Sequence, residues 1–207
     1  MNHQDDDGKR QCIFALGGCP GAGKSTVQET LLRTYPDCVA FVRRMTDRPL
    51  RSDEHASAVW SVPQAEFVRM VRAGEVAAAF GANNHLYGVS LSEIFEILGR
   101  RVRWVGTISA SVATALTPFT RFVPDFPSVV HIYLRVHDAA TLRERLEHRG
   151  HGPDEVDTRM HEYFDADAAW AALADHIIYT DRESSVWNTT REIANILKLP
   201  PRSPVLT

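Results

Sequence analysis

The sequence has few cysteines, no long apolar run and no large excess of charge of either sign. Three cysteines among 207 residues do not suggest a disulfide framework, so we expect a protein of a reducing compartment. No apolar stretch approaches the roughly 20 residues that cross a bilayer, and the polar first ten residues do not resemble a signal peptide. A formal net charge of −3 gives no general basic field for nucleic acid or an anionic membrane. These absences predict a soluble, cytoplasmic protein that binds neither nucleic acid nor a membrane.

Predicted strands and helices alternate along the chain, which is typical of an α/β domain with a central parallel sheet and crossover helices. Predicted strands cover residues 12–16, 38–42, 76–80, 102–107, 129–136 and 176–179. Predicted helices cover residues 25–34, 63–73, 91–98, 110–116, 139–148, 155–174 and 184–197. Residues 117–128 contain three prolines and are expected to form an irregular connection. We expect a disordered tail over residues 1–10, one domain over 11–199 and an extended end over 200–207.

A glycine-rich segment between the first predicted strand and the first predicted helix has the pattern G-x-x-x-x-G-K-[ST]. It reads Gly-Cys-Pro-Gly-Ala-Gly-Lys-Ser from Gly18 to Ser25, which is the pattern of a phosphate-binding loop, or P-loop. Glycines let successive backbone N–H groups point at phosphate oxygens, and the following helix directs its positive dipole end there. Lys24 is expected to bind the β- and γ-phosphates of ATP, and Ser25 to ligate Mg²⁺. The predicted nucleotide-binding residues are Gly18, Gly21, Ala22, Gly23, Lys24, Ser25 and Thr26.

Arginines bracket a second segment late in the chain that contains two glycines and a proline. This composition between two predicted helices indicates a mobile linker, and we place a lid over about residues 149–158. A flexible lid brings guanidinium groups to a transferred phosphate and excludes water. We therefore predict that Arg145, Arg149 and Arg159 are catalytic together with Lys24; the alternative is a solvated helix face. Arg143 is expected to lie on such a face, paired with glutamates three or four residues away on its own helix.

A third basic cluster, residues 43–51, follows the second predicted strand and contains four arginines. Ligands of open α/β sheets bind beyond the carboxyl ends of strands, and arginine favours bidentate contacts with phosphate. The cluster therefore predicts a site for an anionic acceptor; the alternative is a charged surface turn. Its predicted acceptor-binding residues are Arg43, Arg44, Asp47 and Arg48. For Asp47 we favour a structural role, in a salt bridge with Arg44 or Arg48.

The order of these features resembles guanylate kinase and its relatives. In that family a P-loop is followed by an arginine-rich segment, an S-x-x-E-F helix, G-E-F, Y-Y-G, and R-L-x-x-R-G before a further lid arginine. The corresponding stretches here are residues 18–25, 43–51, 62–67, 73–76, 86–89 and 145–150, so the resemblance covers roughly residues 11–197. It implies a three-layer P-loop NTPase fold with an acceptor-binding insert over about residues 43–89 and an arginine-bearing lid. It also implies that Tyr87 binds the acceptor.

The chain departs from guanylate kinases where those proteins bind GMP. Asp47 and Leu50 stand at positions of phosphate-binding arginines, and Val59 replaces a tyrosine. Ala78 replaces a glutamate that reads guanine, and residues 106–109 lack the expected acid. A guanine site needs acceptors for the N–H donors of the base, so these changes predict an acceptor other than GMP.

Ribose 1,5-bisphosphate phosphokinases, a sister group that binds no base, resemble the chain more closely at these positions. The partial matches are residues 45–48, 53–55, 80–83, 86–89 and 106–107, with the Arg and Asp of an I-T-R-D segment transposed. We therefore predict an ATP- and Mg²⁺-dependent phosphotransferase, a monomer or homodimer, whose acceptor is a ribose bisphosphate-like metabolite or an atypical nucleoside monophosphate. The alternatives are GMP, a small-molecule hydroxyl with Asp47 or Asp53 as base, and a non-catalytic interaction module. No zinc site is predicted, because the histidines lack metal-ligand spacing.

Overall fold

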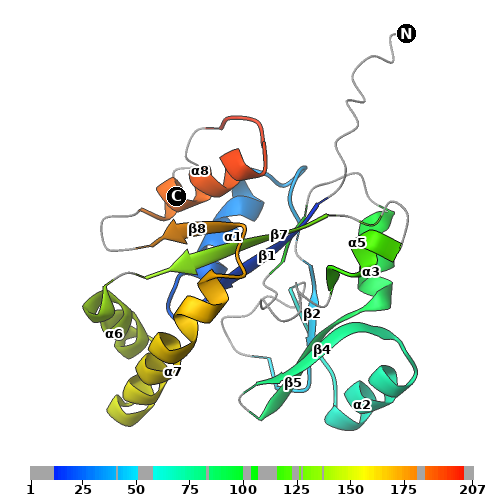
Figure 1. Cartoon of the computed structure of the whole chain (residues 1–207), viewed down its shortest axis with the longest axis horizontal. Coiled ribbons are helices and arrows are strands. Elements are labelled where there is room, and N and C mark those ends of the chain that lie inside the picture. The colour runs from blue at the N-terminus through cyan, green and yellow to red at the C-terminus, as the bar shows by residue number, and fades with distance from the viewer. Residues whose placement is uncertain are drawn as a thin grey trace.

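The computed structural model describes residues 12–40, 42–50, 58–82, 84–99, 104–106, 116–122, 126, 128–136, 138–180 and 185–202. These residues form two four-stranded sheets with helices packed around them (Figure 1). The first sheet is built from the N-terminal and C-terminal parts of the chain, and the second from residues 44–90. Among the helices of this part of the chain, none combines the length and apolar character that crossing a membrane requires.

The first sheet is parallel throughout and has the strand order β6-β1-β7-β8. Its strands are β1 (Cys12–Gly18), β6 (Trp104–Gly106), β7 (Ser128–Arg135) and β8 (His176–Tyr179). The central strand β1 is buried at five successive positions, as expected of a strand with neighbours on both edges and layers on both faces. Parallel pairing brings the carboxyl ends of the strands to one edge, where β1 runs into the P-loop.

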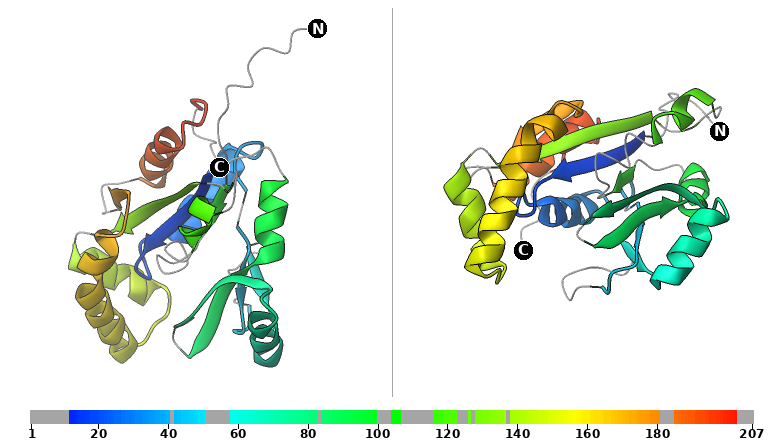
Figure 2. Two further views of the ribbon diagram at one scale, coloured as in Figure 1. Left: turned by 45° about the vertical axis from the view of Figure 1, so that its right-hand side comes forward. Right: turned by 60° about the horizontal axis from the view of Figure 1, so that its bottom comes forward.

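Two pairs of helices accompany the first sheet. The first pair, α1 (Lys24–Thr34) and α8 (Val186–Ile196), packs its apolar side chains against Phe14, Leu16 and Leu134 in one buried cluster. The second pair, α6 (Ala139–His148) and α7 (Pro153–Ala171), lies beyond the ends of β7 and β8 (Figures 1 and 2). Asp138 caps α6 by accepting hydrogen bonds from the Ala140 and Thr141 amides at 3.1 and 2.9 Å, and a proline opens α7.

The second sheet has the order β3-β2-β5-β4, in which only β2 and β3 are parallel. Its strands are β2 (Arg44–Thr46), β3 (Val59–Ser61), β4 (Val76–Ala82) and β5 (His85–Ser90). One face packs against α2 (Gln64–Arg72) through Met45, Phe67 and Met70. The opposite face, through Ala78 and Val89, shares an apolar cluster with β1 of the first sheet. The helix α3 (Leu91–Leu98) follows β5, and a short helix, α5 (Phe119–Phe122), precedes β7.

The predicted strand at residues 38–42 is wrong. The amides of Cys38 and Val39 both donate to Tyr35 O, so the chain turns at the end of α1, and residues 38–40 and 42 form no strand. The strand nearest to the prediction, β2, begins at Arg44. The prediction also missed β3 and β5, because β3 has only three residues and β5 has a histidine and a glycine among its apolar residues.

Several other predictions concern segments near the chain ends and before β7. The predicted helix at 110–116 lies outside the described residues except for Leu116, and α5 falls inside the region expected to be irregular. The predicted tail, residues 1–10, also lies outside the described residues. Residues 200–202 have no regular secondary structure, and the Arg202 guanidinium lies 5.7 Å from the centre of the Tyr35 ring.

Candidate active site

The P-loop joins β1 to α1 at the carboxyl edge of the first sheet. Three of its glycines have positive φ angles, 138° at Gly18, 90° at Gly21 and 86° at Gly23. A Cβ atom would lie 2.5 Å from Leu134 O at Gly18 and 3.0 Å from Leu142 Cδ1 at Gly21. Glycine is therefore required both for the backbone conformation of the loop and for its close packing on β7 and α6.

The N-terminal end of α1 is arranged for an anion. The N-cap residue Gly23 supplies no side-chain hydrogen bond, and the first turn of α1 contains no acidic residue. The first amides of the helix and its positive dipole end therefore remain suited to a phosphate. The side chains of Ser25 and Thr26 are exposed at this end, and the Ser25 hydroxyl is a hard oxygen ligand of the kind Mg²⁺ prefers. The described residues contain no group of three or more His, Cys, Asp or Glu side chains placed to hold a metal ion.

Lys24 folds back over the loop that precedes it. Its Nζ donates hydrogen bonds of 2.8 Å to Gly18 O and to Cys19 O. Burial is the largest influence on the pKa of Lys24 and lowers it from 10.5 to about 8. The Cys19 thiol opposes this change, and the positive charges of Arg149 and Arg44 lower the pKa further. Arg149 lies at the end of α6 and Arg44 on β2, so cations from two other parts of the fold lie within electrostatic range of Lys24.

A cavity of about 450 Å³ opens beside the P-loop. Its walls come from the loop, from α6 and from the first turns of α8, and they include Gly21, Gly23, Thr26, Thr141, Glu144, Arg145, His148, Arg149, Thr180 and Thr189. The predicted residues Gly21, Ala22, Gly23, Thr26, Arg145 and Arg149 are all found here. Of the others, Gly18, Lys24 and Ser25 belong to the same loop, whereas Arg159 is not part of the wall.

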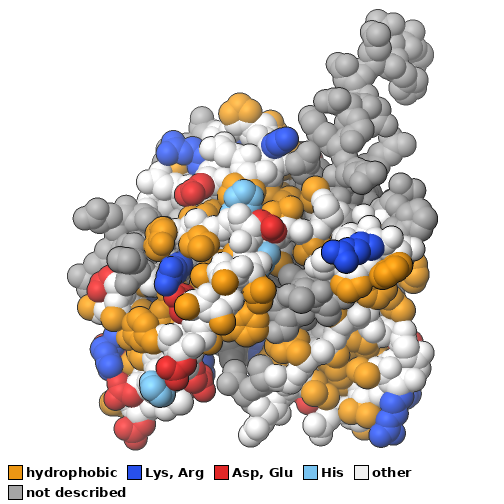
Figure 3. All heavy atoms as spheres, in the orientation of Figure 1, with side chains coloured by type: hydrophobic (Ala, Val, Ile, Leu, Met, Phe, Trp, Pro, Cys, Tyr) orange, Lys and Arg blue, Asp and Glu red, His pale blue; other side chains and the backbone are white. Residues whose placement is uncertain are grey.

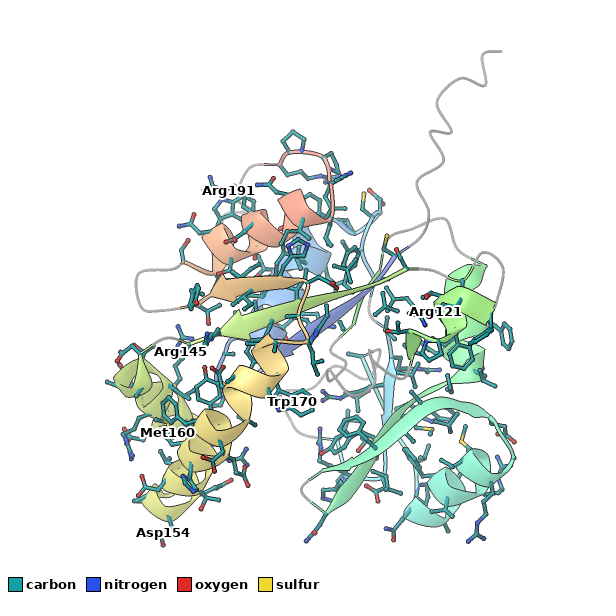
Figure 4. All side chains as sticks on the ribbon, viewed as in Figure 1. Arg121, Arg145, Asp154, Met160, Trp170 and Arg191 are labelled. Atoms are coloured by element: carbon teal, nitrogen blue, oxygen red, sulfur yellow. The ribbon has the colours of Figure 1, made fainter. Side chains whose placement is uncertain are left out.

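Arg145 and Thr180 tie the wall of this cavity to the P-loop. The Thr180 hydroxyl donates to Ala22 O at 3.1 Å and is 5% exposed. Arg145 Nη1 lies 3.3 Å from Gly21 O and 3.5 Å from Thr180 Oγ1, beside the ends of β7 and β8 (Figure 4). Thr180 was not among the predicted site residues, although its position directly after the last strand of a parallel sheet was a usable signal.

The two lid arginines differ in what they contact. Arg149 is the exposed C-cap residue of α6 and lines the cavity. Arg159 lies on α7 and binds Glu155 of the same helix, with 2.7 Å between Nη2 and Oε1. His151 Nδ1 lies 3.0 Å from the same carboxylate. The guanidinium and the imidazole both hold the pKa of Glu155 below its usual value. Arg159 would therefore have to leave the Glu155 carboxylate before its guanidinium could bind the transferred phosphate.

Arg143 is on a solvated surface, as the sequence suggested, but its partner differs. It binds Asp157 of α7 at 2.6 Å rather than a glutamate of its own helix. Acidic, basic and histidine side chains lie together over α6 and α7 at the lower left of Figure 3. Both partners are about half exposed or more, so the pair contributes little to stability.

The predicted acceptor residues fall into two groups. Arg43 is engaged structurally, because its amide donates to Glu93 at 2.8 Å and its guanidinium lies 5.3 Å from the centre of the Trp60 ring. Asp47 is also structural, but the expected arginine partner is wrong: its Oδ1 accepts from the Leu86 amide at 2.9 Å and lies 3.1 Å from His85 Nδ1. Arg48 is 7% exposed and donates to Pro49 O. Arg44 and Tyr87 remain turned toward the P-loop side of the second sheet, as the strand register requires.

The positions that differ from guanylate kinase motifs are mostly apolar and buried. Ala78 is 6% exposed and lies in the apolar cluster with Val89 and Ile94, and Val59 is 4% exposed. Leu50 is 41% exposed. Of residues 106–109, only Gly106 is among the described residues. At Ala78 and Val89 the second sheet therefore offers a ligand no polar side chain.

Comparison with known proteins finds no family model that matches the chain. Guanylate kinase from Novosphingobium aromaticivorans is 28% identical over 195 residues, which cover 91% of this chain and 84% of that protein. Guanylate kinases from Nitrosomonas europaea and Geobacter sulfurreducens are each 26% identical, over 70% and 83% of this chain and 69% and 82% of theirs. The crystal structure of guanylate kinase from Anaplasma phagocytophilum superposes with a TM-score of 0.65 at 21% identity, covering 91% of this chain and 85% of that one.

These comparisons confirm the predicted resemblance and the predicted fold. The structural neighbour supports the P-loop NTPase fold, and the sequence relatives support a kinase of the guanylate kinase type. The partial likeness to ribose 1,5-bisphosphate phosphokinases stays a prediction.

Proposed function

We propose that this guanylate kinase-like P-loop kinase transfers the γ-phosphoryl group of ATP to a small phosphorylated acceptor bound on the P-loop side of the second sheet. One observation carries the proposal: three P-loop glycines have positive φ angles, and Lys24 at the start of α1 holds its Nζ 2.8 Å from Gly18 O and Cys19 O. A cation at the end of α6, Arg149, and a cation on the second sheet, Arg44, lie within electrostatic range of this lysine. Such convergence is costly in a protein that binds no anion there, and it is what a transferred phosphoryl group needs.

The donor nucleotide fits the first sheet. The P-loop amides and Lys24 are placed for the β- and γ-phosphates, and the adjoining cavity of about 450 Å³ has room for the ribose and base. Arg145 and Thr180 line this cavity and hydrogen-bond to carbonyl groups of the P-loop, so they would hold the cavity wall in place beside the bound nucleotide. Ser25 would hold Mg²⁺, which neutralises charge between the β- and γ-phosphates when bound.

Catalysis by these residues would consist of positioning and charge neutralisation. Lys24 would exchange its two carbonyl acceptors for phosphate oxygens, and Arg149 would reach the transferred group from the end of α6. A phosphate acceptor is already anionic near neutral pH, so no general base is required. This agrees with the structural role of Asp47, whose carboxylate is occupied by Leu86 and His85.

The second sheet favours an acceptor without a guanine base. Ala78 and Val89 are buried among apolar side chains and provide no acceptor for the N–H groups of guanine. A ribose bisphosphate-like metabolite or an atypical nucleoside monophosphate suits this surface better. GMP is the second candidate, and the observation in its favour is that the relatives of the chain reported above are guanylate kinases.

An acceptor screen tests the proposal. ADP release is measured with GMP, dGMP, ribose 1,5-bisphosphate and unphosphorylated sugars, for the natural protein and for Lys24→Ala. We expect turnover with a phosphorylated acceptor and a loss of about 10²- to 10³-fold in Lys24→Ala. Arg191→Ala, on the outer side of α8, is the control and should keep full activity (Figure 4). If turnover is fastest with GMP, the acceptor is GMP, the second candidate. If Lys24→Ala keeps full activity, the proposed P-loop kinase mechanism is wrong.

A further inference from the structure

A histidine–aspartate pair lies at one end of the second sheet. His85 opens β5 directly after Asn84, whose φ angle is 58°, and Asp47 directly follows β2. The His85 Nδ1 atom is 3.1 Å from Asp47 Oδ1, and the same oxygen accepts the Leu86 amide at 2.9 Å. The Asp47 side chain is 4% exposed, whereas that of His85 is 38% exposed. The aspartate is thus fixed in the protein, and the histidine remains accessible to a ligand.

The pair determines which nitrogen of His85 meets a ligand. A carboxylate only accepts hydrogen bonds, so the Nδ1 atom beside Asp47 carries a hydrogen. The other nitrogen, Nε2, is directed away from Asp47 because the two nitrogens lie on different sides of the imidazole ring. A histidine held in this way presents Nε2 in one fixed direction.

The strand register places His85 on the same face as Tyr87 and Arg44. Side chains alternate along a strand, so His85 and Tyr87 share one face of β5, about 7 Å apart. Tyr87 is opposite Thr46 of β2, and therefore Thr46 and Arg44 share that face. The other face carries Met45 and Leu86, which pack in the cluster with α2.

This face of the second sheet is turned toward the P-loop. Arg44 lies close enough to Lys24 to lower its pKa, and Ala78 and Val89 on the same face share a cluster with β1. In Figure 1 and in both views of Figure 2, the end of the β4–β5 hairpin that carries His85 is turned toward α6 and α7. His85 thus lies on the acceptor side of the proposed reaction, across from the lid.

We propose that His85, oriented by Asp47, binds the anionic phosphate of the acceptor through a protonated Nε2. This inference rests on the proposed function, since it assigns the phosphate of that acceptor a specific contact. An isolated aspartate at this place would repel a phosphate. Here the buried carboxylate faces the imidazole, so a ligand meets the imidazole ring and Tyr87 instead.

The charged neighbours of His85 are few in the part of the chain that the structure describes. Asp47 and Arg48 directly follow β2, the strand that pairs with β5. Tyr87 lies on β5, the strand that His85 opens. The paired strand β4 contains no titratable residue. Arg44 shares this face with His85, and Arg44 and Arg149 are both near enough to Lys24 to lower its pKa. A protonated imidazole at His85 therefore adds a positive charge to the face that carries Arg44.

Steady-state kinetics with the best acceptor of the screen test the inference. We expect His85→Gln to raise the KM for the acceptor about tenfold or more, while kcat changes less and the KM for ATP stays constant. His85→Lys keeps a positive charge at this position and should keep a low KM for the acceptor. Each variant is compared with the natural protein at the same pH.

A second pair of the same type serves as the control. His161 and Asp165 on α7 lie 3.4 Å apart with both side chains exposed, so His161→Gln should leave every constant unchanged. Asp47→Asn, checked for folding by its thermal transition, should give an intermediate rise in the KM for the acceptor.

A binding measurement without ATP separates the inference from the proposed function. Titration of inorganic phosphate into the natural protein should shift the imidazole ¹H and ¹⁵N signals of His85 and leave those of His161 in place. Turnover of a phosphorylated acceptor with equal KM in His85→Gln would overturn the inference and leave the proposed function standing. Absence of turnover with every phosphorylated acceptor would overturn the proposed function; unmoved His85 signals would overturn the inference by themselves.

Discussion

The two sheets of this protein offer different kinds of groups to the phosphates that we propose they bind. At the first sheet, positive φ angles at three glycines and the end of α1 direct backbone groups at the ligand, and Lys24 adds one charge. At the second sheet, side chains on alternate positions of two paired strands form the surface, chiefly Arg44 and Tyr87. If the proposed reaction is correct, the difference teaches that backbone geometry fixes the donor site, whereas the side chain at each strand position decides which acceptor binds.

Breaking the backbone of the donor site should have the largest effect. Gly18→Ala places a Cβ 2.5 Å from Leu134 O at a φ of 138°, so we expect about 2–3 kcal/mol of lost stability and more than 100-fold weaker ATP binding. Gly152→Ala is the matched control, because no atom lies within 4 Å of the added Cβ and its φ is −68°. Thermal unfolding and calorimetric titration with ATP measure both effects. Equal ATP affinity in the two variants would contradict the importance of the loop backbone.

The lid arginines should have unequal effects. Arg149→Ala removes a positive charge that lies within electrostatic range of Lys24, and we expect kcat to fall about 10- to 100-fold. Arg159→Ala should reduce kcat less, because Glu155 already binds this guanidinium. Rapid-quench measurements of the chemical step compare the two. A larger loss in Arg159→Ala would mean that Arg159 leaves Glu155 in the closed enzyme and contributes more charge than Arg149.

A substitution on the second sheet should separate acceptor binding from donor binding. Tyr87→Phe removes a hydroxyl on the face shared with Arg44, and we expect the KM for the acceptor to rise about tenfold at an unchanged KM for ATP. Thr180→Val should do the reverse, since its hydroxyl binds Ala22 O of the P-loop. Thr158→Val, on the exposed side of α7, is the control for Thr180. Parallel changes in both KM values would show that the two sheets do not act separately.

The smallest effect concerns the proton on Lys24. Its lowered pKa of about 8 means that Lys24 is mostly neutral at pH 8.5 when no ligand is bound, and phosphates favour the charged form. ATP binding at pH 8.5 should therefore take up about 0.8 proton, and affinity should fall as the pH rises above 8. Titration calorimetry in buffers of different ionisation enthalpy measures the uptake. Lys24→Arg stays charged and should take up none; equal uptake in this variant would assign the proton to another group.

The contrast between the sheets also explains what the sequence could predict. The P-loop could be located because its function depends on glycines and a lysine at fixed spacing, and β1 and α1 flank it as expected. On the second sheet, short strands such as β3 carry too few residues for a periodic pattern, and the register was needed to place Arg44 on the same face as Tyr87. The His85–Asp47 pair joins residues 38 positions apart, so no local pattern could reveal it. Arg159 was predicted to be catalytic from its position, but its contact with Glu155 depends on the geometry of α7.

A crystal structure with Mg²⁺, a non-hydrolysable ATP analogue and the acceptor tests the account most directly. We predict that Lys24 Nζ leaves Gly18 O and Cys19 O for the β- and γ-phosphates, with the adenosine in the cavity bounded by Arg145 and Thr180 and the acceptor on the face of Arg44 and Tyr87. A nucleotide bound elsewhere, with Lys24 still on the two loop carbonyls, would contradict the account.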